Sequence, residues 1–139
     1  MTKEEVIQTL ERNRPAFLEK FNCSISDVDI KAGICMMNFE VSPDYCHSID
    51  IIQGGFVTSM LDAVSSHALF CTDPSIINVS TIELKVSFYA PSRAGKYKAI
   101  GRVEKQGYKT AFLSADLIDA TGEKTAVLSA TAKIVRAKS

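Results

Sequence analysis

The residues best placed for chemistry begin with two adjacent glycines, Gly54 and Gly55, which directly precede a strongly helical pattern. Glycine lets a backbone approach a ligand closely, and the first N–H groups of a helix have no partner inside the helix. These N–H groups carry partial positive charge, so they could hold a carbonyl oxygen as it becomes an oxyanion. The alternative is that the glycines only permit a tight turn into the helix.

Asp62 is the second candidate, because it is the one acid in the interior of that helix. Asp is a poor helix-interior residue, since its side chain competes for backbone hydrogen bonds. It shares a helix face with Thr58, Ser59, Ser65 and Ser66, and this face carries no Lys, Arg or Glu. Such a face suggests a covering element or a second subunit, and an acid under that cover would serve as a base or a nucleophile. The alternative is a solvated surface acid.

The two histidines have different predicted roles. His47 lies in a predicted loop over residues 42–53 and could act as a base or a hydrogen-bond donor, although a lone loop histidine is more often incidental. His67 falls at the edge of the helix's apolar stripe and is predicted to pack in the core. Neither histidine stands at a spacing typical of zinc ligands, so no metal is expected. The absence of a G-x-S-x-G motif argues against a serine hydrolase.

Basic residues concentrate in the 91–109 segment and could bind phosphate groups. They are Arg93, Lys96, Lys98, Arg102, Lys105 and Lys109. The best candidates for substrate phosphates are Arg93, Lys109 and the turn at Gly107. An ordinary solvated sheet face is the alternative.

Hydrophobic periodicity predicts the elements that must position these residues. An amphipathic helix is predicted for 3–21, kinked or divided at Pro15. Further along the chain we expect a strand at 30–41, the helix at 55–71, and four strands in a meander at 81–90, 97–103, 111–117 and 126–135. In the first strand of the meander, Ile82, Leu84, Val86 and Phe88 are predicted to form the buried face. The fold class is therefore α+β, with one antiparallel sheet and a long helix against one face.

Length and composition favour one globular domain and exclude several classes of protein. The chain has 139 residues, with 16 Lys plus Arg against 16 Asp plus Glu, and a chain of this length can bury a substantial core. The zero net charge argues against nucleic-acid binding. No apolar run is long enough to span a membrane, and the N-terminus lacks the apolar region of a secretory signal. The four cysteines form no C-x-x-C pair, which favours reduced, buried thiols in a cytoplasmic protein.

Two segments together resemble the hotdog-fold acyl-CoA thioesterases of the phenylacetic-acid-pathway type. They are QGGFVTSMLDAVSSHA and STIELKVSFYAPSRAGKYKAIGRVEKQGYKTAFLSADLIDATGEKTAVLSATAKI. The family pattern is His-Gly-Gly, an acid eight residues after the first glycine, a strand led by Thr or Ser and ending in Pro, and a final D-x-x-G turn. The match covers roughly residues 30–136.

The resemblance implies roles for particular residues. Asp62 corresponds to the catalytic acid, and Gly54 to the glycine whose backbone N–H polarises the thioester carbonyl. Gln53 stands where the family often has His, and His47 where it usually has an amide side chain. Both would position the carbonyl or the water.

Counted back from Pro91, the family's hydroxyl residue corresponds to Thr81. Counted forward from Asp62, it corresponds to Ser80. The alternation of the strand favours Thr81 as the catalytic residue and leaves Ser80 beside the substrate. The remaining candidate substrate contacts, taken from the glycine pair and the basic segment, are Gly55, Gly107, Lys109 and Arg93.

The resemblance implies one hotdog domain over residues 1–139, with a helical segment at 1–24 and the sheet wrapped around the central helix. Two subunits would join sheet edges, Asp62 of one facing Gly54 of the other, and such dimers commonly form tetramers. The implied activity is hydrolysis of an acyl-CoA thioester to a free acid and coenzyme A, with Asp62 as general base or nucleophile and no cofactor. The expected partners are acyl-CoA and a second copy, with neither nucleic acid nor membrane. The alternatives are an acyl-thioester dehydratase and a non-catalytic acyl-CoA-binding protein.

Overall fold

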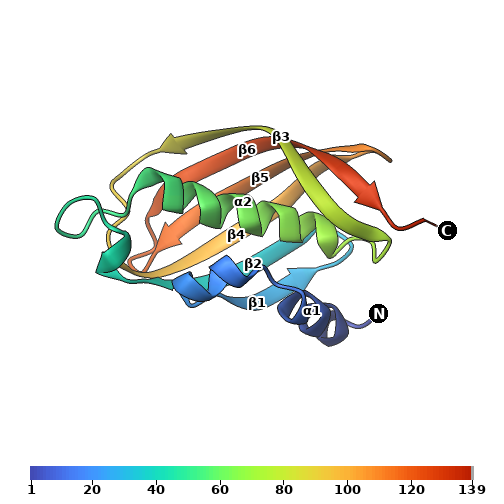
Figure 1. Cartoon of the computed structure of the whole chain (residues 1–139), viewed down its shortest axis with the longest axis horizontal. Coiled ribbons are helices and arrows are strands. Elements are labelled where there is room, and N and C mark those ends of the chain that lie inside the picture. Colours follow the sequence, from blue (N-terminus) through green and yellow to red (C-terminus); the bar gives the residue numbers. More distant parts are fainter. Residues whose placement is uncertain (139) are drawn as a thin grey trace.

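The structure, a computed structural model, describes residues 1–138 and consists of one six-stranded antiparallel sheet curved around a long helix (Figure 1). The helices are α1 (Lys3–Arg12) and α2 (Gly54–Phe70), and the 3-10 helices are η1 (Ala16–Phe21) and η2 (Pro43–Tyr45). The strands are β1 (Ser24–Asp29), β2 (Ile34–Val41), β3 (Ile76–Phe88), β4 (Gly95–Gln106), β5 (Thr110–Asp119) and β6 (Lys124–Arg136). This arrangement confirms the predicted α+β hotdog fold with an additional N-terminal helix. Within the described residues, no helix is both long and apolar enough to cross a bilayer.

The N-terminal helical segment is divided around Pro15, as the sequence predicts. Thr2 caps α1 reciprocally with Glu5, each side chain accepting the backbone N–H of the other residue. Val6 and Leu10, one turn apart, are buried on one face of α1. Beyond Pro15 the chain continues as the 3-10 helix η1 rather than as a second α-helix.

Strand β1 is absent from the sequence prediction, because a bulge hides its period of two. Ile25 and Val28 are both buried although they stand three residues apart. The pairing of β1 with β2 shifts register between Ile25 and Asp27, which accounts for the odd spacing. The predicted strand at 30–41 is correspondingly shorter, since β2 begins only at Ile34.

The strand order corrects the predicted meander. The order in the sheet is β1-β2-β4-β5-β6-β3, so of the four strands predicted to form the meander only β4, β5 and β6 lie side by side in chain order. Strand β3 lies at the far edge and pairs with β6, with Thr81 opposite Ala132 and Phe88 opposite Ala126. Periodicity identifies a segment as a strand, but it carries no information about which strand lies beside it.

Helix α2 lies unusually close to the sheet where it crosses β4. A Cβ atom at Gly101 would stand 2.5 Å from the carbonyl carbon of Val64, so only glycine permits this approach. The predicted apolar stripe of α2 is confirmed for the buried residues Val57, Met60, Leu61, Val64, Ala68 and Cys71. Phe56 is the exception, at 37% exposed. The helix that carries Asp62 is therefore fixed against the sheet by close packing.

The edge strand β3 is more exposed than its alternation predicts. Ile82 is 65% exposed, Leu84 36% and Phe88 54%, so the prediction that these side chains are buried is wrong for the single chain. Among residues 1–138, β3 pairs only with β6, and its outer backbone edge has no neighbouring strand. A long apolar edge of this kind is a template for pairing with another chain.

Candidate active site

The glycine pair forms the beginning of α2. Gln53 is the N-cap residue and its side chain makes no capping hydrogen bond. The first N–H groups that bond to the carbonyl oxygen of Gln53 belong to Phe56 and Val57, at 2.9 and 3.3 Å. The N–H groups of Gly54 and Gly55 therefore precede the hydrogen-bonded part of the helix, at its positive end.

The two glycines have different surroundings. A Cβ atom at Gly54 would lie 3.2 Å from Cζ of Phe88, so glycine allows this ring of β3 to cover the start of the helix. A Cβ atom at Gly55 would meet nothing within 4 Å. Packing within the chain thus accounts for Gly54 and leaves the surroundings of Gly55 open.

Asp62 lies in the middle of α2 and faces β3. The hydroxyl of Thr81 donates a 3.0 Å hydrogen bond to Oδ1 of Asp62. The carboxyl group is only half-buried and also lines a cavity between α1, α2 and β3. Thr81 occupies one carboxylate oxygen, so the other remains available to accept a proton from a ligand or a water molecule.

A bulge in β3 accompanies the contact between Thr81 and Asp62. The register with β6 shifts between Thr81 and Glu83, and such bulges redirect side chains beside functional sites. Ser80, the alternative hydroxyl, is exposed and makes no hydrogen bond to Asp62 in the described structure. The geometry therefore brings Thr81, rather than Ser80, to the acid.

The loop that carries His47 and Gln53 is anchored at several points. It contains isolated β-bridges between Cys46 and Ile52 and between Ile51 and Arg93. His47 is exposed, and its Nδ1 lies 3.0 Å from the hydroxyl of Ser48. Gln53 is also exposed, and its backbone N–H donates to the carbonyl oxygen of Tyr45.

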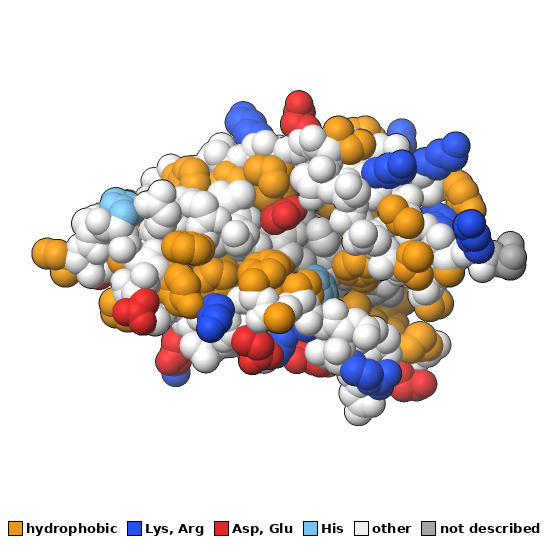
Figure 2. All heavy atoms as spheres, in the orientation of Figure 1, with side chains coloured by type: hydrophobic (Ala, Val, Ile, Leu, Met, Phe, Trp, Pro, Cys, Tyr) orange, Lys and Arg blue, Asp and Glu red, His pale blue; other side chains and the backbone are white. Residues whose placement is uncertain are grey.

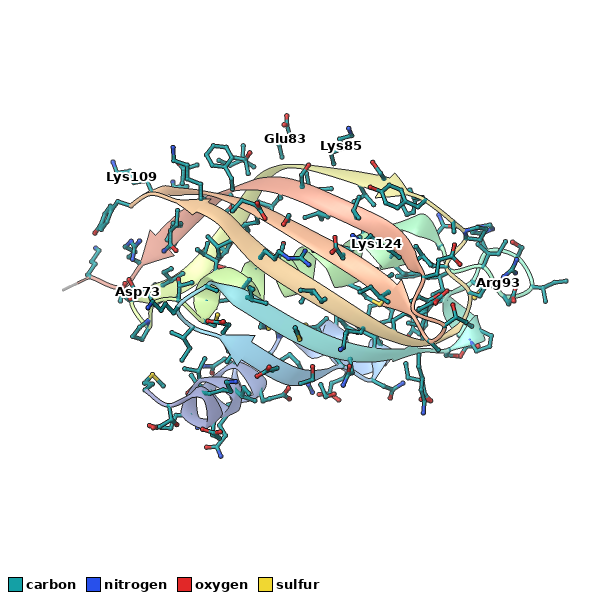
Figure 3. The ribbon with its side chains drawn as sticks, turned by 180° about the vertical axis from the view of Figure 1, so that it is seen from behind. Asp73, Glu83, Lys85, Arg93, Lys109 and Lys124 are labelled. Atoms are coloured by element: carbon teal, nitrogen blue, oxygen red, sulfur yellow. The ribbon has the colours of Figure 1, made fainter. Side chains whose placement is uncertain are left out.

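Arg93 belongs to this loop anchor. Its guanidinium donates to Asp50 at 2.7 Å, although both side chains remain largely exposed. Arg93 and Lys109 lie at opposite ends of the molecule (Figure 3). Within one chain the structure therefore does not bring together these two predicted phosphate ligands.

The turn with Gly107 and Lys109 joins β4 to β5 and is held by the last strand. Gly107 donates its N–H to Thr110, and the guanidinium of Arg136 lies 4.6 Å from the ring centroid of Tyr108. Arg136 also donates to Asp73 at 2.8 Å. The side chain of Lys109 is exposed beside this turn.

Gly54 and Asp62 do not meet within one chain. They are eight residues apart on the same helix, which corresponds to about 12 Å along its axis. One carbonyl group cannot contact both the Gly54 N–H and the Asp62 carboxylate of a single chain. A site that uses both groups needs a second copy.

His67 is buried, as the sequence predicts. Its Nδ1 donates a 2.8 Å hydrogen bond to the carbonyl oxygen of Ala63, which leaves Nε2 as an acceptor. Burial lowers the pKa of His67 below its ordinary value, so the ring is neutral at pH 7.

The three buried thiols, Cys23, Cys35 and Cys71, are poor nucleophiles in this environment. Burial raises the pKa of Cys23 and of Cys71 to about 11 and also raises the pKa of Cys35. Cys46 is half-buried rather than buried, which departs from the prediction. All four cysteines are free, as expected.

A family model of the thioesterase superfamily matches residues 50–126, more than half of the chain. The curated protein Acyl-coenzyme A thioesterase 13 of Homo sapiens is 29% identical over 121 residues, which are 86% of this chain and 84% of that protein. An uncharacterized protein of Schizosaccharomyces pombe, C26H8.11c, is 30% identical over 95 residues, 68% of this chain and 54% of that protein.

Two solved structures share the fold. A phenylacetic acid degradation-related protein of Ralstonia eutropha superposes with a TM-score of 0.83 at 25% identity, covering 92% of this chain and 98% of that one. The PaaI protein from the phenylacetic acid degradation operon of E. coli has a TM-score of 0.84 at 14% identity, covering 97% and 96%. The second likeness is one of fold alone.

Proposed function

Because this chain belongs to the thioesterase superfamily, we propose that it hydrolyses an acyl-coenzyme A thioester to a free acid and coenzyme A. One observation carries the proposal: the half-buried carboxylate of Asp62 accepts a hydrogen bond from Thr81 and lines a cavity. The human relative is named as an acyl-coenzyme A thioesterase, which supports coenzyme A as the leaving group.

In the proposed mechanism Asp62 acts as the general base. It removes a proton from a water molecule, whose oxygen attacks the thioester carbonyl. The backbone N–H at Gly54, together with the helix dipole, stabilises the oxyanion of the tetrahedral intermediate. The carbon–sulfur bond then breaks, and the proton held by Asp62 passes to the departing thiolate. Direct attack by Asp62 to form an anhydride would need a second hydrolytic step, so we favour the base.

The supporting residues have defined tasks in this proposal. Thr81 fixes the orientation of the Asp62 carboxylate. Gln53 and His47, from the loop that precedes α2, position the thioester carbonyl or the water. Gly55 and Ser80 border the substrate. No metal or redox cofactor takes part in this scheme.

The proposed site is shared between two copies of the chain. The axial separation of about 12 Å between Gly54 and Asp62 supports this arrangement, and so does the exposed apolar edge of β3, with Ile82 at 65% and Phe88 at 54% exposed. Two such dimers would give a tetramer. Lys109 and the Gly107 turn are the favoured contacts for coenzyme A phosphates, because Arg93 is already paired with Asp50.

The proposal is tested by comparing wild type with Asp62→Asn in a thiol-release assay on acetyl-, hexanoyl-, hexadecanoyl- and phenylacetyl-CoA. Turnover should fall by about two to four orders of magnitude, as is typical when a general base is lost. Asp44→Asn is the matched control, since Asp44 is an exposed acid in η2. It should leave turnover unchanged.

Three results would contradict the proposal. Near-wild-type turnover of Asp62→Asn would remove this residue from the mechanism. Acyl-CoA binding by wild type without thiol release would indicate a non-catalytic binding protein. A monomer of 15.2 kDa by light scattering at micromolar concentration would contradict the shared site.

A further inference from the structure

A cavity of about 580 Å³ extends from Asp62 along the second half of α2. Figure 2 shows this face of the molecule hollowed, with hydrophobic side chains around the hollow. On α2 the cavity is lined by one face of the helix, namely Asp62, Ala63, Ser66, His67 and Phe70, and the C-cap residue Cys71 continues this face. The nine steps from Asp62 to Cys71 correspond to about 13 Å along the helix axis.

The walls of the cavity suit an uncharged, apolar occupant. They include Val6, Leu10, Phe17, Phe70 and Ile77, and no Lys or Arg lines the cavity in the described structure. His67 is neutral at pH 7, because burial lowers its pKa. Asp62 is therefore the one charged side chain among the described residues that line the cavity. It lies at the end of the cavity where the thioester would react.

The outer wall comes from a part of the chain that the family model does not match. The match covers residues 50–126, whereas Val6, Thr9 and Leu10 lie on α1 and Phe17 on η1. The shape of the cavity is thus a property of this chain's N-terminal segment as well as of the thioesterase core.

We propose that this cavity holds the acyl chain and that α1 limits it to a straight, medium-length chain of about ten carbons. The inference rests on the proposed function, since it assigns the substrate class of the same site. The chain length follows from the run of about 13 Å along α2 that lines the cavity and an advance of about 1.3 Å per carbon in an extended chain. Continuity of the cavity with the Asp62 carboxylate favours an acyl chain over any separate ligand.

The test narrows the cavity from α1. Thr9 is a half-buried cavity residue, whereas its neighbour Gln8 is exposed and lies outside the cavity. Thr9→Trp therefore fills the cavity, and Gln8→Trp is the matched control with the same substitution on the same helix. The readout is kcat/KM for acetyl-, hexanoyl-, decanoyl- and hexadecanoyl-CoA.

For wild type, kcat/KM should rise by up to about fourfold per buried methylene as far as decanoyl-CoA and not beyond it. Thr9→Trp should lower kcat/KM for decanoyl-CoA by about tenfold or more while acetyl-CoA stays within about twofold. Gln8→Trp should keep the wild-type profile. Phe70→Ala should move the optimum to longer chains, and this variant decides the question if Thr9→Trp does not fold.

The outcomes separate this inference from the proposed function. If wild type releases no thiol from any ester, the proposed function fails and the inference fails with it. If wild type is active but the variants at Thr9 and Phe70 keep its chain-length profile, only the inference fails. A change in molar mass on Thr9→Trp would show that the cavity is covered by a second copy, which would also overturn the inference.

Discussion

Replacing Gly101 by Ala should push α2 away from the sheet and misplace Asp62, although Gly101 lies on β4 and outside the site. A Cβ atom there would stand 2.5 Å from the carbonyl carbon of Val64 and 2.9 Å from the backbone nitrogen of Ser65. Ordinary contacts begin at 3.4 Å, so the helix must retreat by about 1 Å at this point. Both neighbouring atoms belong to the backbone, so a side-chain rotation cannot relieve the clash.

The expected consequences follow from this displacement. Overpacking of this kind costs about 1–3 kcal/mol, which lowers the Tm by roughly 3–15 °C. The same shift would stretch the hydrogen bond between Thr81 and Asp62 from its 3.0 Å, and a misplacement of about 1 Å can lower kcat by about 100-fold. Thermal melting by circular dichroism measures the first effect. Thiol release by the folded variant at 25 °C measures the second.

A matched variant controls for the added methyl group. A Cβ atom at Gly107 would lie 3.4 Å from the carbonyl oxygen of Thr110, an ordinary contact, so Gly107→Ala should melt like wild type. If Gly101→Ala also melts like wild type and keeps its kcat, close packing of α2 on β4 does not position Asp62.

Further variants test the acid's partner, the phosphate contact and the buried histidine. Thr81→Val should lower kcat by about 10- to 100-fold, as expected for a lost hydrogen bond to a charged group. Ser80→Ala removes an exposed hydroxyl that does not contact Asp62, so it should change kcat by less than about twofold, whatever it does to KM. Equal effects on kcat would contradict the assignment of Thr81. Lys109→Ala should raise KM for an acyl-CoA with little change in kcat, and the effect should shrink at high salt because exposed charges are screened; a KM that does not depend on salt would argue against a phosphate contact. The pKa of His67 is lowered in the folded state from its ordinary 6.5, so the unfolded chain binds more protons below that pH and the free energy of unfolding should fall as pH drops below 6.5. In urea titrations between pH 6.5 and 5, His67→Phe should make the free energy of unfolding depend less on pH. An unchanged pH dependence would show that another group causes the loss of stability.

The features predicted correctly from the sequence are those encoded by local signals. The period of 3.6 residues defined α2. The lone acid on its small-residue face drew attention to Asp62, and the catalytic role of this residue stays a prediction. Alternation along the strand favoured Thr81, and the structure places its hydroxyl 3.0 Å from Asp62.

The features that escaped prediction depend on contacts between distant segments. The bulge between Ile25 and Asp27 conceals β1, and the position of β3 beside β6 follows from pairing across the whole chain. The packing of Phe88 on Gly54 and the wall that α1 adds to the cavity require the folded chain. Hydrophobic periodicity in the sequence does not encode any of these contacts.

The edge position of β3 has a consequence for the order in which the chain folds. Thr81 pairs with Ala132, 51 residues further along, and such non-local pairing is slow because a long loop must close first. A chain is synthesised from its N-terminus, so α2 and β3 emerge well before β6, the neighbour that holds β3 in the sheet. The hydrogen bond from Thr81 to Asp62 therefore forms only after β6 has paired with β3. Nascent chains that end before residue 124 should contain Asp62 but lack this hydrogen bond.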